Sequence, residues 1–112
     1  SLKSAPPTLK HLLVTLSCMF DTPHKLVEWS ALSIEWNMVD KHAKKSMVYT
    51  LEDGRAHVYK EGSVVNETRL RQSDASLQLH NVTVGDEGLY TCRVINPLIY
   101  TDERRTGENH TV

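Results

Sequence analysis

The six histidines and two cysteines of this 112-residue chain are the first residues to consider for catalysis or metal binding. No two of the six histidines lie four residues apart, as a helical pair of metal ligands would, and none joins a cysteine pair at zinc-ligand spacing. The sequence also has no nucleophile elbow and no glycine-rich phosphate or dinucleotide loop. We therefore expect no catalytic, cofactor-binding or metal-binding site, and no enzyme activity. The histidines are His11, His24, His42, His57, His80 and His110.

The two cysteines, Cys18 and Cys92, belong to a wider pattern. Trp36 lies between them, and Tyr90 precedes the second cysteine by two residues, within residues 86–92 (DEGLYTC). An early cysteine, a tryptophan and a tyrosine two positions before a second cysteine are hallmarks of an immunoglobulin-type β-sandwich. In that all-β fold a disulfide Cys18–Cys92 would join two antiparallel sheets. Trp36 and Tyr90 would then pack in the core beside it.

The cysteine count and the glycosylation motifs both bear on the cellular compartment. Two cysteines fit one disulfide and an oxidising compartment, and two buried, reduced cysteines are the alternative. Asparagine begins an N-x-T motif at Asn66, Asn81 and Asn109, which predicts glycosylation on a secreted surface. Asn81 follows a core strand closely, so a glycan there needs an outward-facing turn.

Length and charge further limit the kind of protein that this sequence can encode. The chain is long enough for one V-type sandwich over residues 1–112, and we expect it to be part of a larger ectodomain. Its formal net charge of −1 gives no indication of nucleic-acid binding. No apolar run approaches the roughly 20 residues that cross a bilayer. We expect an extracellular or cell-surface location, with any membrane anchor outside this sequence.

Period-two alternation of apolar residues predicts the strands. About 56 residues separate Trp36 from Cys92, which leaves room for the additional strands of the variable type. Residues 82–86 have room for one short helical turn. The predicted strands are 13–18, 33–38, 47–51, 57–60, 76–80 and 89–95, with a last strand within 105–112. Their predicted inward residues are Val14, Leu16, Cys18, Ile34, Trp36, Met38, Leu77, Leu79, Tyr90, Cys92 and Val94.

A partner-binding surface is predicted on the outward residues of neighbouring strands and on the loop that follows residue 95. That loop is unusually apolar, and exposed apolar clusters often mark interfaces, with tyrosine as a good anchor. The alternative is that Leu98 and Ile99 pack on the lip of the sandwich and begin the last strand. The predicted partner-binding residues are Glu35, Asn37, Tyr49, Arg93, Ile95, Leu98, Ile99 and Tyr100.

An ion pair is predicted at the corner before Tyr90. Asp86 occupies a position where a carboxylate commonly pairs with an arginine, and a bidentate pair would close that end of the sandwich. Arg69 is the predicted cation, and Arg71 is the alternative.

Residues 74–82 (DASLQLHNV), followed by residues 86–92, resemble the membrane-distal V-set domains of the butyrophilin and T-cell costimulatory-ligand group. The long spacing from Cys18 to Trp36 and residues 69–71 (RLR) are similar to that group as well. Residues 96–98 (NPL) look most like its ligands for an activating natural-killer-cell receptor. The resemblance implies a ligand for a receptor on an opposing lymphocyte or natural killer cell, which modulates the activation of that cell.

A second resemblance implies a different role. Residues 33–36 (SIEW) and 91–94 (TCRV) look like the coxsackievirus–adenovirus receptor and junctional-adhesion group, whose distal domains pair with themselves. It implies an adhesion module that self-associates through the same sheet. In both cases the partner is a protein and no cofactor is involved.

Overall fold

The computed structural model describes residues 12–20 and 31–95, and the backbone of residues 105–111. Its elements follow one another as strands with two short helical turns. They are β1 (Val14–Leu16), β2 (Ser33–Val39), β3 (Lys45–Glu52), β4 (Arg55–Val58), β5 (Ser63–Val65), α1 (Glu67–Leu70), β6 (Leu77–Leu79), the 3₁₀ helix η3 (Val84–Asp86), β7 (Leu89–Ile95) and β8 (Arg105–Thr111).

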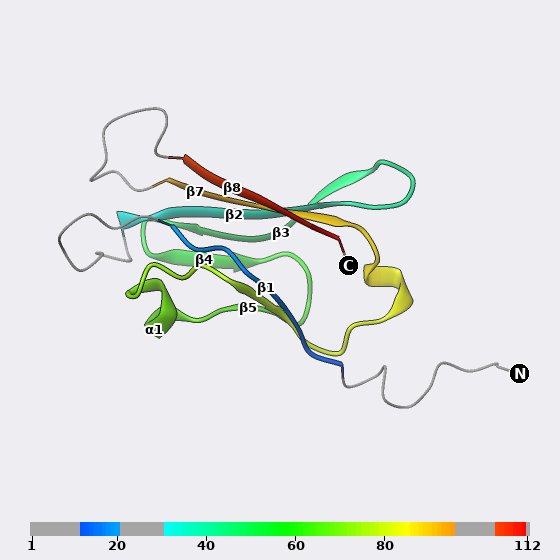
Figure 1. The fold of residues 1–112 in the computed structure, drawn as a ribbon, viewed down its shortest axis with the longest axis horizontal. Helices are drawn as coiled ribbons and strands as arrows, with labels where there is room; N and C mark the ends of the chain where they lie inside the picture. The colour runs from blue at the N-terminus through cyan, green and yellow to red at the C-terminus, as the bar shows by residue number, and fades with distance from the viewer. Residues whose placement is uncertain (1–11, 21–30, 96–104, 112) are drawn as a thin grey trace, which may run out of the picture.

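The strands form two antiparallel sheets (Figure 1). The small sheet has the order β1-β6-β5, and the large sheet has the order β4-β3-β2-β7-β8. The helical turn α1 lies at one end of the domain, and η3, drawn in yellow, lies at the other end. The all-β fold of two antiparallel sheets predicted from the sequence is confirmed.

The core forms where the inward rows of the two sheets meet. Cys18 and Cys92 form a disulfide, and both are fully buried together with Trp36 and Tyr90. The indole Nε1 of Trp36 donates a hydrogen bond of 3.0 Å to the carbonyl oxygen of Ala75, so this large side chain is buried without leaving its polar atom unpaired. Except for Val14, which is partly buried against the core, every predicted inward residue is buried.

Strict alternation fails at a β-bulge between β2 and β3. Trp36 pairs with Tyr49 but the next residue, Asn37, pairs with Met47, so Val48 is the extra residue. Tyr49 therefore lies on the same side as Trp36, and its side chain is only 5% exposed. Burial, followed by the negative charge of nearby Glu67, raises its pKa. The prediction that Tyr49 belongs to the partner-binding surface is wrong because the bulge turns it into the core.

Asn37 is a second correction to the predicted surface. It lies on the central strand β2, between its register partners Met47 on β3 and Thr91 on β7. With a neighbour on each side it is only 9% exposed, so little of it is available to a partner.

The β3–β4 hairpin begins its second strand earlier than predicted. Asp53 and Gly54 both have positive φ angles, of 53° and 75°, and Glu52 pairs directly with Arg55. A two-residue turn with two left-handed residues reverses the chain at once. For this reason β4 covers residues 55–58 rather than 57–60.

A polar network at η3, which we call the corner network, consists of Lys60, Thr83, Asp86 and Tyr90. Lys60 Nζ lies 2.5 Å from Asp86 Oδ1, and the Thr83 backbone N–H donates to Asp86 Oδ2 at 2.9 Å. The Tyr90 hydroxyl donates to the carbonyl oxygen of Asp86 at 2.7 Å. Partial burial opposes the ionisation of Asp86, but the bonds from Lys60 and Thr83 outweigh it and hold its pKa below the ordinary value. Burial and the charge of Asp86 raise the pKa of Tyr90 to about 12.

The predicted cation at this corner was wrong. Arg69 lies in α1, at the opposite end of the domain from η3 (Figure 1). Residues 67–70 form a helical turn, so they do not run toward the corner as a strand. The alternative cation, Arg71, instead pairs with Glu67 one helical turn away, at 3.4 Å. Lys60, in the connection between β4 and β5, occupies the position that the arginine was expected to fill.

Candidate protein-binding face

The outward side of the large sheet collects residues from four adjacent strands into one surface. His57 of β4, Thr50 of β3, Glu35 of β2 and Arg93 of β7 are in register across the sheet. Residues directly opposite each other share a face, so these four side chains form one row. We define the outer face by the residues Ser33, Glu35, Met47, Thr50, His57, Tyr59, Arg93 and Ile95.

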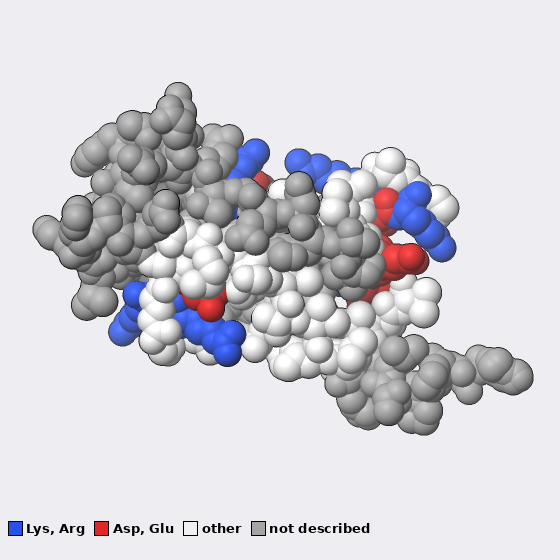
Figure 2. Space-filling view, viewed as in Figure 1, with Lys and Arg blue, Asp and Glu red and all other residues white. Residues whose placement is uncertain are grey.

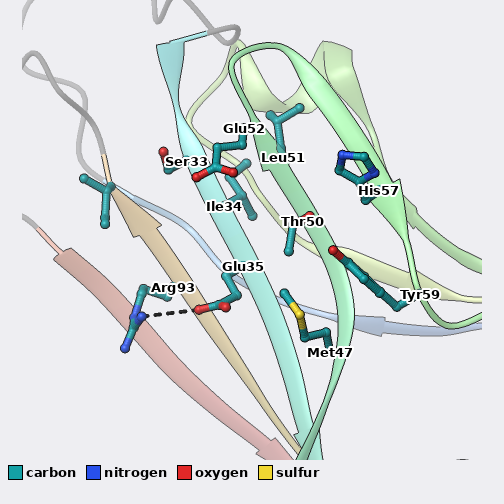
Figure 3. Close-up of a pocket in the computed structure, with 11 residues that line it drawn as sticks. Ser33, Ile34, Glu35, Met47, Thr50, Leu51, Glu52, His57, Tyr59 and Arg93 are labelled. Carbon is teal, nitrogen blue, oxygen red and sulfur yellow. Dashed lines mark hydrogen bonds and ion pairs between the residues drawn. The ribbon is translucent and has the colours of Figure 1, made fainter.

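A hollow of about 470 Å³ lies in this outer face, and Figure 3 shows the side chains that line it. Three of them are large apolar groups exposed to solvent: Met47 (38% exposed), Tyr59 (55%) and Ile95 (42%). The rings of His57 and Tyr59 lie 6.4 Å apart between centroids, on the β4 side of the hollow. Exposed apolar groups bordered by polar ones are typical of a contact surface.

One ion pair crosses the outer face between neighbouring strands. Arg93 Nη1 donates to Glu35 Oε1 at 3.3 Å, and both side chains remain partly exposed (Figure 3). Such a pair contributes only about 0.2–1 kcal/mol to folding, because water screens it. It nevertheless holds one positive and one negative group side by side, within reach of a partner.

The structure brings together only some of the predicted partner-binding residues. Glu35, Arg93 and Ile95 lie on the outer face, whereas Asn37 and Tyr49 are buried. The three predicted loop residues, Leu98, Ile99 and Tyr100, lie outside the described residues.

Sequence reasoning assigned Tyr49 of β3 to this face and missed the residues that β3 and β4 contribute to it, Met47, Thr50 and His57. Met47 and Thr50 point outward only because the bulge at Val48 changes the alternation between them. His57 reaches the face because the two-residue turn at Asp53 and Gly54 sets the register of β4. The Asp-Gly dipeptide indicates this turn in the sequence, although the following strand was predicted to begin two residues too late, whereas the bulge has no comparable signal.

Two of the three predicted glycosylation sites fall within the described side chains. Asn66 is exposed and precedes α1, and Asn81 is exposed in a turn after β6. Asn109 lies in β8, whose side chains are outside the description. Among the residues that the structure describes, no group of three or more His, Cys, Asp or Glu side chains is placed to hold a metal ion. The same part of the chain contains no helix long and apolar enough to cross a membrane.

Comparison with known proteins places this geometry in a family. The Immunoglobulin V-set domain family matches residues 12–112. Tapasin-related protein from Mus musculus is 33% identical over 99 residues, which cover 85% of this chain and 21% of that protein. CXADR-like membrane protein from Homo sapiens, like that from Rattus norvegicus, is 35% identical over 89 residues, which cover 74% of this chain and 23% of that protein.

The chain thus spans about a fifth to a quarter of the length of these relatives. They are tapasin-related and CXADR-like proteins, not specifically butyrophilins or costimulatory ligands, so the finer resemblance stays a prediction. The family match agrees with the disulfide between two antiparallel sheets. The chain belongs to the immunoglobulin V-set domain family.

Proposed function

We propose that this domain is an extracellular recognition module that binds another protein through the outer face of the large sheet. The observation that carries the proposal is the hollow with exposed Met47, Tyr59 and Ile95 around it and the Glu35–Arg93 pair across it. Tyrosine, methionine and arginine are enriched at protein interfaces relative to other surfaces, and all three are present here.

The extracellular location is supported by two independent features. The disulfide between Cys18 and Cys92 fits an oxidising compartment. Relatives that match most of this chain are named as membrane proteins, which is consistent with a domain displayed at a cell surface.

The finer form of the proposal is that the partner is a receptor on an opposing lymphocyte or natural killer cell. The resemblance of residues 74–82 and 86–92 to costimulatory-ligand V-set domains supports it. In this form Glu35 and Arg93 orient the receptor, and Tyr59 and Ile95 act as the apolar anchors.

The second candidate is an adhesion module that pairs with its own copies. The arrangement of charges on the outer face favours it, because a two-fold axis would place Glu35 of one copy opposite Arg93 of the other. The CXADR-like relatives also favour it, since the second resemblance pointed to the same group.

A binding screen tests both candidates. The mammalian-expressed domain, displayed multivalently, is measured against a panel of immune-receptor ectodomains and against itself. Binding to one receptor supports the immune-ligand form, and binding only to itself supports adhesion. The double variant Ile95→Ser with Tyr59→Ser should weaken either interaction by about 2 kcal/mol or more, roughly thirtyfold, if these side chains are anchors.

Val64→Ser supplies the matched control. Val64 lies on the small sheet and is 41% exposed, which nearly equals the 42% of Ile95, so it removes similar apolar surface elsewhere. The control should bind as the parent does. Parental affinity of the Ile95/Tyr59 variant, with an unchanged thermal midpoint, would exclude the outer face as the binding site.

A further inference from the structure

We propose that the small sheet is the glycosylated side of the domain, with N-linked glycans on Asn66 and Asn81 that cover the apolar side chains exposed there. The proposal rests on the extracellular location proposed above. It does not depend on which partner the large sheet binds. Three observations carry it: the geometry of each asparagine, and the apolar surface that lies beside them.

Asn66 is exposed, and its side-chain oxygen is already engaged in a hydrogen bond. Its Oδ1 accepts a hydrogen bond of 3.1 Å from the backbone N–H of Arg69, which makes Asn66 the N-cap of α1. The side chain is exposed, as is Thr68, the threonine of the motif. A glycosylated asparagine keeps its carbonyl oxygen, so the cap and the glycan are compatible on the same side chain.

Asn81 lies in the outward-facing turn that a glycan at this position requires. Its φ of 57° is in the left-handed region, where asparagine is one of the few residues tolerated besides glycine. Asn81 and Thr83 are exposed, while Val82 between them is buried and its N–H donates to the carbonyl oxygen of Leu12 at 3.1 Å. The left-handed turn thus separates an outward asparagine from an inward valine.

The two asparagines bracket the small sheet. Asn66 follows β5 and Asn81 follows β6, and because these strands are antiparallel the two sites lie at opposite ends of the sheet. In Figure 2 the described surface over the small sheet is largely uncharged, and the charged side chains lie around its margins.

Exposed apolar side chains lie next to both sites. Val64, two residues before Asn66, is 41% exposed. Leu12, hydrogen-bonded to the residue after Asn81, is 41% exposed, and Leu13 beside it is 47% exposed. Apolar groups left open on a secreted domain favour association, and a hydrated glycan next to them prevents close approach by another protein.

The modification is a transfer from a lipid-pyrophosphate-linked oligosaccharide to the asparagine amide. The anomeric carbon of the sugar forms a bond to Nδ2, and its bond to the pyrophosphate oxygen breaks. The lipid pyrophosphate leaves with that electron pair, and the amide nitrogen loses one proton. No oxidant or reductant is required.

The test is site-specific mass spectrometry of the domain secreted from mammalian cells. Peptide-N-glycosidase converts each glycosylated asparagine to aspartate, which identifies the occupied positions. Three variants remove single sites while keeping the local structure: Asn66→Asp retains the capping oxygen, Thr68→Ala leaves Asn66 in place, and Asn81→Gly suits a left-handed φ.

We expect both sites to be occupied in the parent, and each variant to lose one glycan while it keeps the disulfide. Secreted, disulfide-bonded protein with unmodified Asn66 and Asn81 would overturn the proposal and leave the extracellular location intact. Protein that enters neither the secretory pathway nor the disulfide-bonded state would instead overturn the location itself, and the proposal with it.

The covering role has its own readout, measured in the Ile95→Ser background so that the outer face does not contribute. In sedimentation experiments Asn66→Asp with Asn81→Gly should associate at concentrations where the glycosylated protein stays monomeric. Adding Val64→Thr and Leu13→Thr should restore the monomer. A doubly unglycosylated protein that remains monomeric would show that the glycans do not serve as a cover.

Discussion

The corner network and the outer face both contain charged groups, but they use them differently. At the corner, Asp86 accepts from Lys60 and from the Thr83 backbone while Tyr90 bonds to its carbonyl, so these groups are satisfied inside the chain. On the outer face, Glu35 and Arg93 form an ion pair with each other, and both side chains stay partly exposed. Internally satisfied polar groups contribute to folding, whereas exposed ones remain available to a partner.

Mutations in the two regions should therefore have opposite effects on stability and on partner affinity. Changes at the corner should lower the free energy of unfolding and leave partner affinity unchanged in the folded protein. Changes on the outer face should lower affinity and leave stability nearly unchanged.

Tyr49→Ala tests where the outer face ends and the core begins. Because Tyr49 is buried beside the bulge, its truncation should lower the free energy of unfolding by about 3–5 kcal/mol, as for other buried aromatic residues. Thr50→Ala, one residue further along β3 and on the outer face, is the control and should have a small effect. Thermal and denaturant unfolding measure both. A Tyr49→Ala protein as stable as the parent would show that Tyr49 is not a core residue and would support its original assignment to the partner-binding surface.

Asp86→Ala tests the corner network as a whole. It leaves Lys60 and the Thr83 N–H without their carboxylate, so the free energy of unfolding should fall by about 1.5–3 kcal/mol. Partner affinity, measured on the folded fraction, should not change. Arg69→Ala is the control, because Arg69 lies at the far end of the domain, and it should leave the thermal midpoint unchanged. Equal midpoints for Asp86→Ala and the parent would refute the role of the network.

The same carboxylate should make stability depend on pH in acid. The pKa of Asp86 in the folded state lies below its ordinary value of 3.8. Its contribution to stability is therefore fully present above the unfolded pKa and is lost as the pH falls through the lower folded pKa. Asp86→Asn should flatten this part of the stability profile. A parent and variant that lose stability in parallel in acid would show that other carboxylates dominate.

Tyr90→Phe removes a single hydrogen bond from the corner while it keeps the buried ring. The lost bond from the hydroxyl to the Asp86 carbonyl should lower the free energy of unfolding by about 1 kcal/mol. Chemical denaturation of the two proteins side by side measures the difference. A loss several times larger would mean that the hydroxyl also organises η3.

Glu35→Ala should have the smallest effect on folding. Unlike the corner variants, it should change partner affinity rather than stability. The exposed Glu35–Arg93 pair stabilises the fold by at most about 1 kcal/mol, so the thermal midpoint should barely move. Partner binding should weaken all the same, and more so at low salt, where charges are less screened. Unchanged affinity at every salt concentration would remove this pair from the binding surface.

The parts of the fold that were predictable from the sequence are those fixed by local alternation and by large buried side chains. The inward rows through Trp36 and Tyr90 alternate with period two, and the disulfide follows from the same pattern. A residue that faces the core must be apolar or have its polar atoms paired, so these rows are visible in the sequence itself.

The features that were not predictable depend on pairing between distant segments. The bulge that turns Tyr49 inward is a property of the β2–β3 register, and no residue type in the sequence indicates it. The cation at Asp86 was misassigned because its identity depends on where the β4–β5 connection places Lys60. The sequence shows that a carboxylate is present, but which cation pairs with it depends on the path of the chain in the folded structure.

The cross-link between Cys18 and Cys92 has a consequence for a module held between two surfaces under tension. A pulling force that enters on one side of the cysteines and leaves on the other passes through the disulfide, with its sequence separation of 74, and bypasses the chain between them. That chain, on the order of 250 Å when extended, cannot lengthen until the bond is reduced. Force spectroscopy should show this length only under reducing conditions, because with the bond intact only the residues before Cys18 and after Cys92 can extend.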